Sequence, residues 1–475
     1  MIESNVRQTR MNTVMKMSAI WITATLLLTL GMARADAAET RPNIIFIFAD
    51  DWGWGDLSCH GSKLYKTPSL DKLASQGTDF YEFTVGNPVC SPSRTAVMTG
   101  HYPARHSVHQ HFASIEHHVA SGMPDWLDPT PVMLPRVLKE AGYVTGHFGK
   151  WHLTNSHVSD PPLPAAYGYD EAAIFNGPGE QVNANPNINA PLATDRAINF
   201  IRQHKDRPFF INLWVHATHT PHYPTERWMK KFEKLDESHR VYAAVVAEAD
   251  ERIGQVLATL DELKLADSTL VVFSSDNGPE VTGKGKEQDD LSTGAGLGEY
   301  YSVGETGGLR GQKRSLYSGG VGVPFIVRWP GHTPAGRVDK TTVITAVDLL
   351  PTFCAAAGVD LPQGYEPDGE NLLRAFKAQS MDRTGPIYWD WRGASHGENW
   401  PRLAIRDGRW KLLMTLDRKR IELYDVVADR QQARDLSAQH PDVTQRLADA
   451  ALAWRKTLPT DTPSQAISKD RRKPK

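Results

Sequence analysis

The chain has 475 residues, of which 40% are hydrophobic and 23% are charged, and its formal net charge is −2. This is the composition of a globular protein, and the length allows two or three domains. Balanced charges argue against a nucleic-acid-binding protein, which needs a concentrated basic face. The three cysteines, Cys59, Cys90 and Cys354, are too few for a disulfide framework and leave at least one thiol unpaired.

Residues 1–35 have the pattern of a secretory signal peptide. Basic side chains precede an apolar run at residues 19–30, and a small-residue cleavage site, Ala-Arg-Ala, follows at residues 33–35. An uncleaved membrane anchor is the alternative, but the apolar run is short for a bilayer span. We therefore expect an exported protein, periplasmic or secreted, that is not attached to the membrane after cleavage.

Strand-like apolar runs alternate with helical patterns over residues 36–384. The first run, NIIFIF at residues 43–48, is apolar throughout, as in strands buried on both faces of a parallel sheet. The next pattern, residues 69–77, begins at serine and ends at glycine, which is typical of a helix. Later strands are expected at residues 143–149, 208–215, 269–275 and 324–329, and later helices at residues 134–142, 193–205 and 241–263. This alternation predicts an α/β catalytic domain in which helices sandwich a large mixed, mostly parallel sheet.

From residue 385 the pattern changes to short strands joined by turns. PIYWDW, RLAIRDGRWKLLM and RIELYDV have strand composition, and one helix pattern follows at residues 442–456. We expect residues 385–475 to form a smaller C-terminal α+β subdomain, with an antiparallel sheet, one packing helix and a basic tail. The glycine-rich segment at residues 278–308 is long for a loop, and we expect it to contribute to the walls of a substrate pocket.

Polar side chains follow four of the predicted strands. Ligands of open α/β sheets bind beyond the carboxyl ends of the strands, and the side chains found there are Asp50, Asp51, Lys150, His152, His219, Asp276 and Asn277. Three carboxylates and one carboxamide form an all-oxygen set, which suits calcium, or more weakly magnesium, rather than zinc. For Asp50 and Asp51 taken alone, the alternative remains that both acids cap loops and face water.

Cys90 lies where a helix is expected to begin, in the stretch NPVCSPSRTAVMTG. Ser91 suits the N-cap and Pro92 the first helical position. Cys90 then lies at the positive end of a helix dipole, and Arg94 on the same element suits an oxyanion. The thiol could be a nucleophile, a structural cysteine or a modified cysteine. A hard-oxygen metal site would not select a soft thiolate, which favours modification.

Two motifs resemble the signatures of the type I sulfatases, which belong to the alkaline-phosphatase-like superfamily. CSPSR at residues 90–94, followed by TAVMTG, is similar to the first signature, and GYVTGHFGKWH at residues 142–152 is similar to the second. The order of DDWGWGD, SDNG and RGQKRSLYSGG also resembles that family, over about residues 41–427. The resemblance implies that Cys90 is oxidised to formylglycine by a formylglycine-generating enzyme. It further implies one calcium ion held by Asp50, Asp51, Asp276, Asn277 and the modified Cys90.

The same resemblance implies roles for the remaining site residues. Arg94 steadies the hydrated formylglycine, and Lys150 and His152 lie beside it. Lys313 contacts the sulfate. His219 lies near the leaving oxygen, and His222 is a competing assignment for that role. The chain departs from the family pattern at residues 318–322, where SGGVG stands in place of Glu-Gly-Gly-x-Arg, so the packing near Lys313 is in doubt.

The expected activity is the hydrolysis of sulfate esters, of carbohydrates or of aryl compounds, through the formylglycine hydrate. One alternative is a phosphonate or phosphate ester hydrolase with the same nucleophile, and a further alternative is a non-catalytic glycan-binding protein. Six histidines gather at residues 101–118. Their spacing is not a regular zinc pattern, so we expect one or two of them to line the substrate cleft.

Overall fold

A computed structural model of the chain describes residues 41–179, 189–281, 302–393 and 400–471. The predicted signal peptide and the centre of the long loop at residues 278–308 lie outside these ranges. The described residues from Pro42 onward form one compact unit. Among the described residues, no helix combines the length and the apolar character that crossing a bilayer requires.

An eight-stranded sheet forms the centre of this unit, in the order β5-β4-β6-β1-β7-β8-β2-β9. Of its strands, only β8 runs antiparallel to its two neighbours, as the pairings with β7 and β2 show. The bounds are β1 Asn43–Ala49, β2 Thr78–Phe80, β4 Val144–Lys150, β5 Glu171–Phe175, β6 Phe209–Trp214, β7 Thr269–Ser275, β8 Phe325–Arg328 and β9 Arg337–Asp339; β3 (Phe83–Thr84) pairs separately with β10 (Ile344–Thr345).

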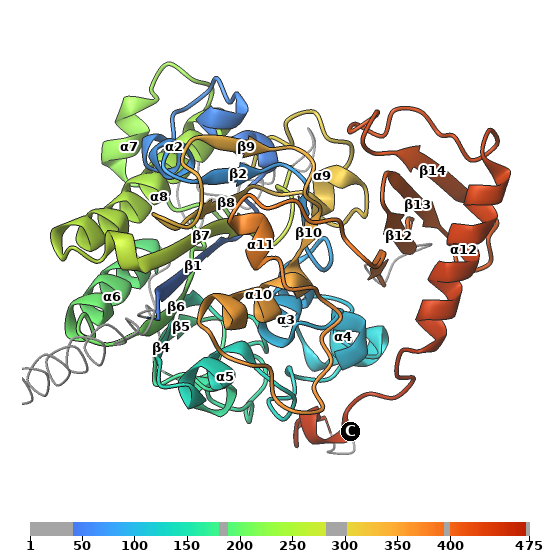
Figure 1. Cartoon of the computed structure of the whole chain (residues 1–475), viewed down its shortest axis with the longest axis horizontal. Coiled ribbons are helices and arrows are strands. Elements are labelled where there is room, and N and C mark those ends of the chain that lie inside the picture. Colours follow the sequence, from blue (N-terminus) through green and yellow to red (C-terminus); the bar gives the residue numbers. More distant parts are fainter. Residues whose placement is uncertain (1–40, 180–188, 282–301, 394–399, 472–475) are drawn as a thin grey trace, which may run out of the picture. The chain divides into compact units, whose positions relative to one another are not determined.

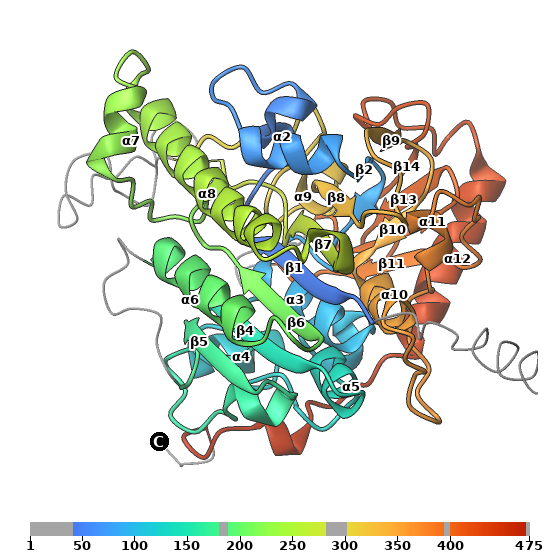
Figure 2. The same ribbon diagram turned by 60° about the vertical axis from the view of Figure 1, so that its left-hand side comes forward.

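Helices cover both faces of this sheet (Figures 1 and 2). One apolar core contains Ile45 and Ile47 of β1 and packs under α2, α6 and α8, whereas the other contains Ile44, Phe46 and Phe48 and packs under α3, α5 and α10. Alternate residues of β1 thus face opposite cores, which explains why the strand is apolar throughout. The helices are α2 Pro68–Ser75, α3 Cys90–Thr99, α4 Ile115–Ser121, α5 Leu134–Glu140, α6 Asn189–Gln203, α7 Glu226–Lys231, α8 Glu237–Glu262, α9 Ser318–Val321, α10 Leu349–Ala356, α11 Leu373–Phe376 and α12 Pro441–Lys456.

A four-stranded antiparallel sheet follows near the C-terminus, in the order β11-β12-β13-β14. Its strands are β11 Ile387–Asp390, β12 Leu403–Asp407, β13 Trp410–Met414 and β14 Ile421–Asp425, and α12 packs against β12 and β13 (Figure 1). The predicted fold class is therefore confirmed. The division into two domains at residue 385 stays a prediction, because one apolar core continues from the large sheet into the small one.

Candidate active site

The polar side chains that were predicted from the strand ends lie together at one edge of the large sheet. Asp50 and Asp51 follow β1, Lys150 closes β4, and Asp276 and Asn277 follow β7. The four oxygen-bearing side chains have no exposed surface. Strands β4, β1 and β7 run parallel, and their carboxyl ends therefore meet at this edge.

Three cations pair with the three buried carboxylates. The ion pairs are Lys150 Nζ–Asp50 Oδ2 at 2.5 Å, Lys313 Nζ–Asp51 Oδ2 at 2.6 Å and Arg94 Nη2–Asp276 Oδ2 at 2.6 Å. The Arg94 guanidinium also lies 4.7 Å from the centre of the Trp214 ring, which holds it from the apolar side. The site is thus an alternating arrangement of buried charges rather than a set of water-facing loop caps.

Burial and neighbouring charges compete at these carboxylates. Burial would raise the pKa of Asp50, but Lys150 and His219 outweigh it and hold that pKa well below its ordinary value. Burial raises the pKa of Asp51 against the opposing effect of Lys313. Burial, followed by repulsion from Asp50, raises the pKa of Asp276 to about 7. Additional positive charge at this point would favour the ionised forms of the last two carboxylates.

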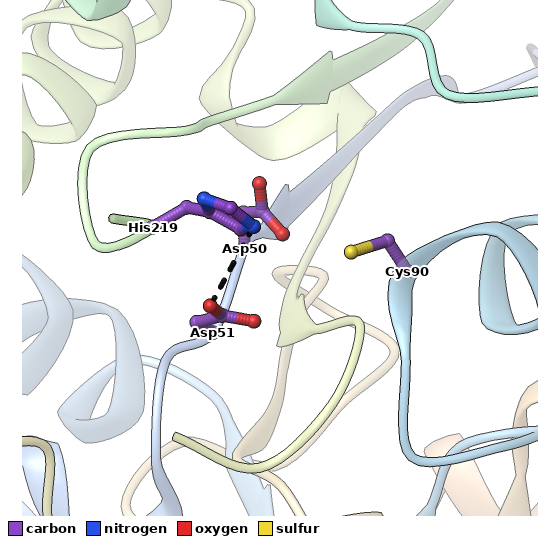
Figure 3. A group of neighbouring side chains, drawn as sticks. All are labelled: Asp50, Asp51, Cys90 and His219. Carbon is purple, nitrogen blue, oxygen red and sulfur yellow. Dashed lines mark ion pairs between the residues drawn. The ribbon is translucent and has the colours of Figure 1, made fainter. Parts of the chain in front are cut away.

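The donor set fits a hard divalent cation. Asp50 Oδ1 and Asn277 Oδ1 are buried and accept no hydrogen bond from any described residue. Asn277 Nδ2 donates to Asp51 Oδ1 at 2.6 Å, which identifies Oδ1 of Asn277 as its free atom. Ligand atoms of Asp50, Asp51, Cys90 and His219 lie within 4.8 Å of one another (Figure 3). Free carboxylate and amide oxygens are calcium ligands, so the residues present are compatible with that ion.

Cys90 faces this group from the first residue of α3. The helix begins two residues earlier than we expected, because its N-cap is Val89 and not Ser91. Ser91 Oγ instead accepts a hydrogen bond from Phe112 N at 3.0 Å. Lys150 Nζ lies 3.4 Å from the Cys90 sulfur, yet burial dominates and raises the pKa of the thiol to about 12. An unmodified Cys90 is therefore a protonated thiol and a poor nucleophile. All three cysteines are free.

A cavity of about 430 Å³ opens beside Cys90. Its lining includes Lys150, His152, His219 and Lys313 from the predicted site, together with His111, Phe112, Ala113, Ser114, Asn155, His157, Asn176, His216 and Arg314. His111 is thus the cleft histidine that we expected from residues 101–118. Among the described residues, none of these six histidines belongs to a group that could hold a metal ion.

His152 is held in one tautomer. It has a left-handed φ of 51°, and its Nε2 donates to the carbonyl oxygen of Phe112 at 2.8 Å. Its Nδ1 is buried and has no partner among the described residues. Burial, and then Lys150, lower the pKa of His152 well below its ordinary value. The imidazole is therefore neutral, with a free lone pair on Nδ1.

The structure separates the two histidines that competed for the leaving-group role. The His219 ring lines the cavity, with Nδ1 donating to the Thr220 carbonyl and Nε2 lying 3.8 Å from Asp51 Oδ2. His222 has no exposed surface and packs against the Tyr242 ring, with 5.5 Å between the ring centres. Of these two histidines, only His219 is placed to contact a substrate in this cavity.

Sequence reasoning missed His216. Its Nδ1 lies 2.5 Å from Asp50 Oδ2, and its ring stacks on His219 with 4.8 Å between centres. Burial outweighs Asp50 and lowers the pKa of His216 to about 4. The signal was available, since His216 lies two residues after the end of β6, at the same sheet edge as the other site residues.

The departure from the family pattern at residues 318–322 is accommodated by close backbone packing. A Cβ atom on Gly319 would meet Gly311 O at 2.1 Å, and one on Gly320 would meet Ser315 O at 2.0 Å. Gly278 N, directly after Asn277, donates to Gly320 O at 2.9 Å. The two glycines therefore join the segment that carries Lys313 to the turn that carries Asn277.

Comparison with known proteins gives the family. A model of the sulfatase family matches residues 42–359, and a model described as N-sulphoglucosamine sulphohydrolase, C-terminal, matches residues 304–456. The chain belongs to the sulfatase family. It is a sulfuric ester hydrolase, as are the named relatives.

The similar proteins include sulfatases from bacteria and animals. The chain is 28% identical to the N-acetylgalactosamine-6-O-sulfatase of Bacteroides thetaiotaomicron, over 86% of this chain and 92% of the relative. It is 33% identical to the N-acetylgalactosamine-6-sulfatase of Homo sapiens, over 75% and 69%. The crystal structure of Ps i-CgsB in complex with k-i-k-neocarrahexaose gives a TM-score of 0.74 at 28% identity, covering 90% of this chain and 94% of that one.

Proposed function

We propose that the chain hydrolyses sulfate esters of carbohydrates, with residue 90 as the nucleophile after oxidation of Cys90 to formylglycine and with calcium as the cofactor. The observation that carries the proposal is the position of Cys90, buried at the start of α3, 3.4 Å from Lys150 Nζ and beside a buried set of oxygen ligands. The names of the N-acetylgalactosamine-6-sulfatases and the carbohydrate complex of Ps i-CgsB support a carbohydrate substrate.

Asp50, Asp51, Asp276, Asn277 and the modified residue 90 would hold the calcium ion. The hydrated formylglycine supplies one hydroxyl for attack on sulfur and a second through which sulfate is released, and calcium supplies positive charge for the sulfate oxygens. A serine at position 90 would lack the second hydroxyl.

Arg94 and Lys150 orient the group at position 90. Arg94 lies one helical turn after residue 90 on α3, and Asp276 fixes its guanidinium at 2.6 Å. Lys150 Nζ bridges Asp50 Oδ2 and the side chain of residue 90. Both groups are buried and charged before substrate arrives, so they stabilise negative charge at the nucleophile without reorganisation.

His152 is the base that acts on residue 90 when sulfate is released. Its Nε2 donates to Phe112, so only Nδ1 can accept a proton. Because the imidazole is neutral at rest, this atom is available without a prior deprotonation step.

Lys313 and His219 act at the leaving oxygen. Burial would lower the pKa of Lys313, but Asp51 outweighs it and raises that pKa above its ordinary value. Lys313 is therefore the charged partner of the leaving oxygen and of the sulfate. Burial, and then Lys150, hold the pKa of His219 well below its ordinary value, and its single N–H donates to Thr220. His219 thus offers Nε2 to the cavity as an acceptor, and the proton that the leaving oxygen takes up comes from Lys313.

The proposal is tested by measuring sulfate release from N-acetylgalactosamine 6-sulfate, with ion chromatography as the readout. The protein is made together with a formylglycine-generating enzyme and exported. Glucose 6-phosphate and a phenyl phosphonate monoester serve as competing substrates. Faster turnover of the sulfate ester supports the proposal. Faster turnover of the phosphorus esters would favour the alternative, a phosphonate or phosphate ester hydrolase. These esters are included because a phosphonate monoester hydrolase from Agrobacterium radiobacter has the same fold (TM-score 0.62, 19% identity).

A further inference from the structure

The segment after α12 returns to the catalytic unit and contacts the loop that follows α4. α12 ends at Lys456, and residues 461–471 then run to the side of the molecule that carries α4 (Figure 1). Thr462 Oγ1 donates to the carbonyl of Gly122, the C-cap of α4, at 3.3 Å, and Arg471 Nη1 donates to the carbonyl of Met123 at 2.7 Å. The described part of the C-terminal segment is therefore bound to a loop of the catalytic unit.

Asp125 is where this segment and the loop are joined. Its backbone N donates to Ala466 O at 2.8 Å, and its Oδ2 accepts from Ser468 N at 2.8 Å. Its Oδ1 accepts from His118 Nδ1 at 2.9 Å, with Arg471 Nη1 at 3.5 Å. The side chain has no exposed surface, so each carboxylate oxygen has a defined and different partner.

His118 connects Asp125 to the cavity wall through two hydrogen bonds. Its Nε2 accepts a hydrogen bond from Ala113 N at 2.8 Å, so its proton must lie on Nδ1, where it is donated to Asp125. His118 and Asp125 have no exposed surface. The direction of both hydrogen bonds is thus fixed, and Ala113, which lines the cavity, is held by a buried imidazole.

The adjacent peptide unit holds His152. Phe112 O accepts from His152 Nε2 at 2.8 Å and from Asn155 Nδ2 at 3.2 Å, and Phe112 N donates to Ser91 Oγ at 3.0 Å. The carbonyl of Phe112 and the N–H of Ala113 belong to one planar peptide group. A rotation of this group away from His118 would also move the carbonyl that fixes the tautomer of His152.

We propose that Asp125 and His118 are positioning residues for His152, and that residues 461–471 are a supporting element of the active site. The proposal rests on the proposed role of His152 as the base at residue 90. The order of contacts is the C-terminal segment, Asp125, His118, the peptide group 112–113 and finally His152. When one of these contacts is removed, His152 Nε2 loses its hydrogen bond to Phe112 O, and that hydrogen bond is what keeps Nδ1 available as the proton acceptor. The catalytic rate therefore falls while substrate binding is retained.

The test uses the full chain and follows turnover of 4-nitrophenyl sulfate at matched formylglycine content. We expect His118→Phe to lower kcat about tenfold while KM changes less than about twofold. Asp125→Asn is a milder second variant, because a carboxamide cannot accept from both Ser468 N–H and His118 Nδ1–H. Asp160→Asn is the matched control. Asp160 accepts from Ser468 Oγ at 2.5 Å and from Lys469 N at 3.0 Å, so it holds the same segment without contacting His118.

The decisive comparison is made in a His152→Ala background. If His118 acts through His152, His118→Phe lowers kcat in the parent enzyme but changes it less than about twofold in His152→Ala. An equal decrease in both backgrounds, or an unchanged kcat in Asp125→Asn, would overturn the inference. We expect Asp160→Asn to lower kcat less than Asp125→Asn does, because it loosens the segment without removing a contact of His118. If His152→Ala itself leaves kcat unchanged, it is the proposed base that is wrong, which is a separate result.

Discussion

Replacing Arg94 by methionine should be among the most destabilising single substitutions at the site. Methionine keeps much of the side-chain volume but removes the guanidinium that lies 2.6 Å from Asp276 and 3.6 Å from Asp50, where neither partner is exposed. Asp50 keeps Lys150, whereas Asp276 loses its only ion-pair partner among the described residues. Removing one member of a buried ion pair costs about 3–5 kcal/mol. We therefore expect the free energy of unfolding to fall by about that amount.

Urea unfolding of metal-free protein, followed by tryptophan fluorescence and analysed by linear extrapolation, measures this change. Arg202→Met is the matched control, because Arg202 pairs with Glu262 at 3.0 Å while both side chains are at least half exposed. An exposed pair contributes about 0–1 kcal/mol. The reasoning would be refuted if Arg94→Met lowered the unfolding free energy no more than Arg202→Met does.

Three further predictions concern the nucleophile, the cofactor and a buried lysine. Cys90→Ser should keep the melting temperature within a few degrees of the parent value. It should lower turnover of 4-nitrophenyl sulfate by at least about a thousandfold, because serine has no second hydroxyl through which sulfate can be released. Multiple turnover at the parent rate would contradict this. Adding calcium at a hundred times its Kd to chelated protein should stabilise it by about 2.7 kcal/mol, seen as a higher urea midpoint, whereas an unchanged midpoint would argue against a calcium site. Burial, and then Arg406, lower the pKa of Lys411 to about 7 from the ordinary 10.5, so the unfolded chain binds more protons between these pH values and stability should rise with pH across that window. Lys411→Met should remove this rise in melting temperature between pH 7 and pH 10, and a rise equal to that of the parent would show that another group titrates.

The central strands were predictable because they are continuous apolar runs. β1 and β7 lie within one residue of their expected positions, and the carboxylates that follow them meet because parallel strands end at one edge. The reversed direction of β8 could not be predicted, since three apolar residues followed by Arg328 do not indicate in which direction the strand runs. The start of α3 was misplaced because Ser91 bonds to Phe112, a tertiary partner, instead of capping its own helix.

The supporting contacts of the site were less accessible to sequence reasoning. His216 and His219 follow the same strand, but the resemblance to the sulfatases indicated a role for His219 only. Asp125 and His118 carry no motif at all. Their alignment depends on a segment more than 300 residues later in the chain, at Ser468, which only the folded structure brings to Asp125.

The central claim is that residue 90 is the modified nucleophile of a sulfatase. The mass of the tryptic peptide that contains residue 90, from protein made together with a formylglycine-generating enzyme, tests it most directly. A mass about 18 Da below that of the cysteine peptide, with its hydrate beside it, is the result that we predict. A peptide that is fully alkylated as cysteine, from protein that still releases sulfate at the same rate, would contradict the claim.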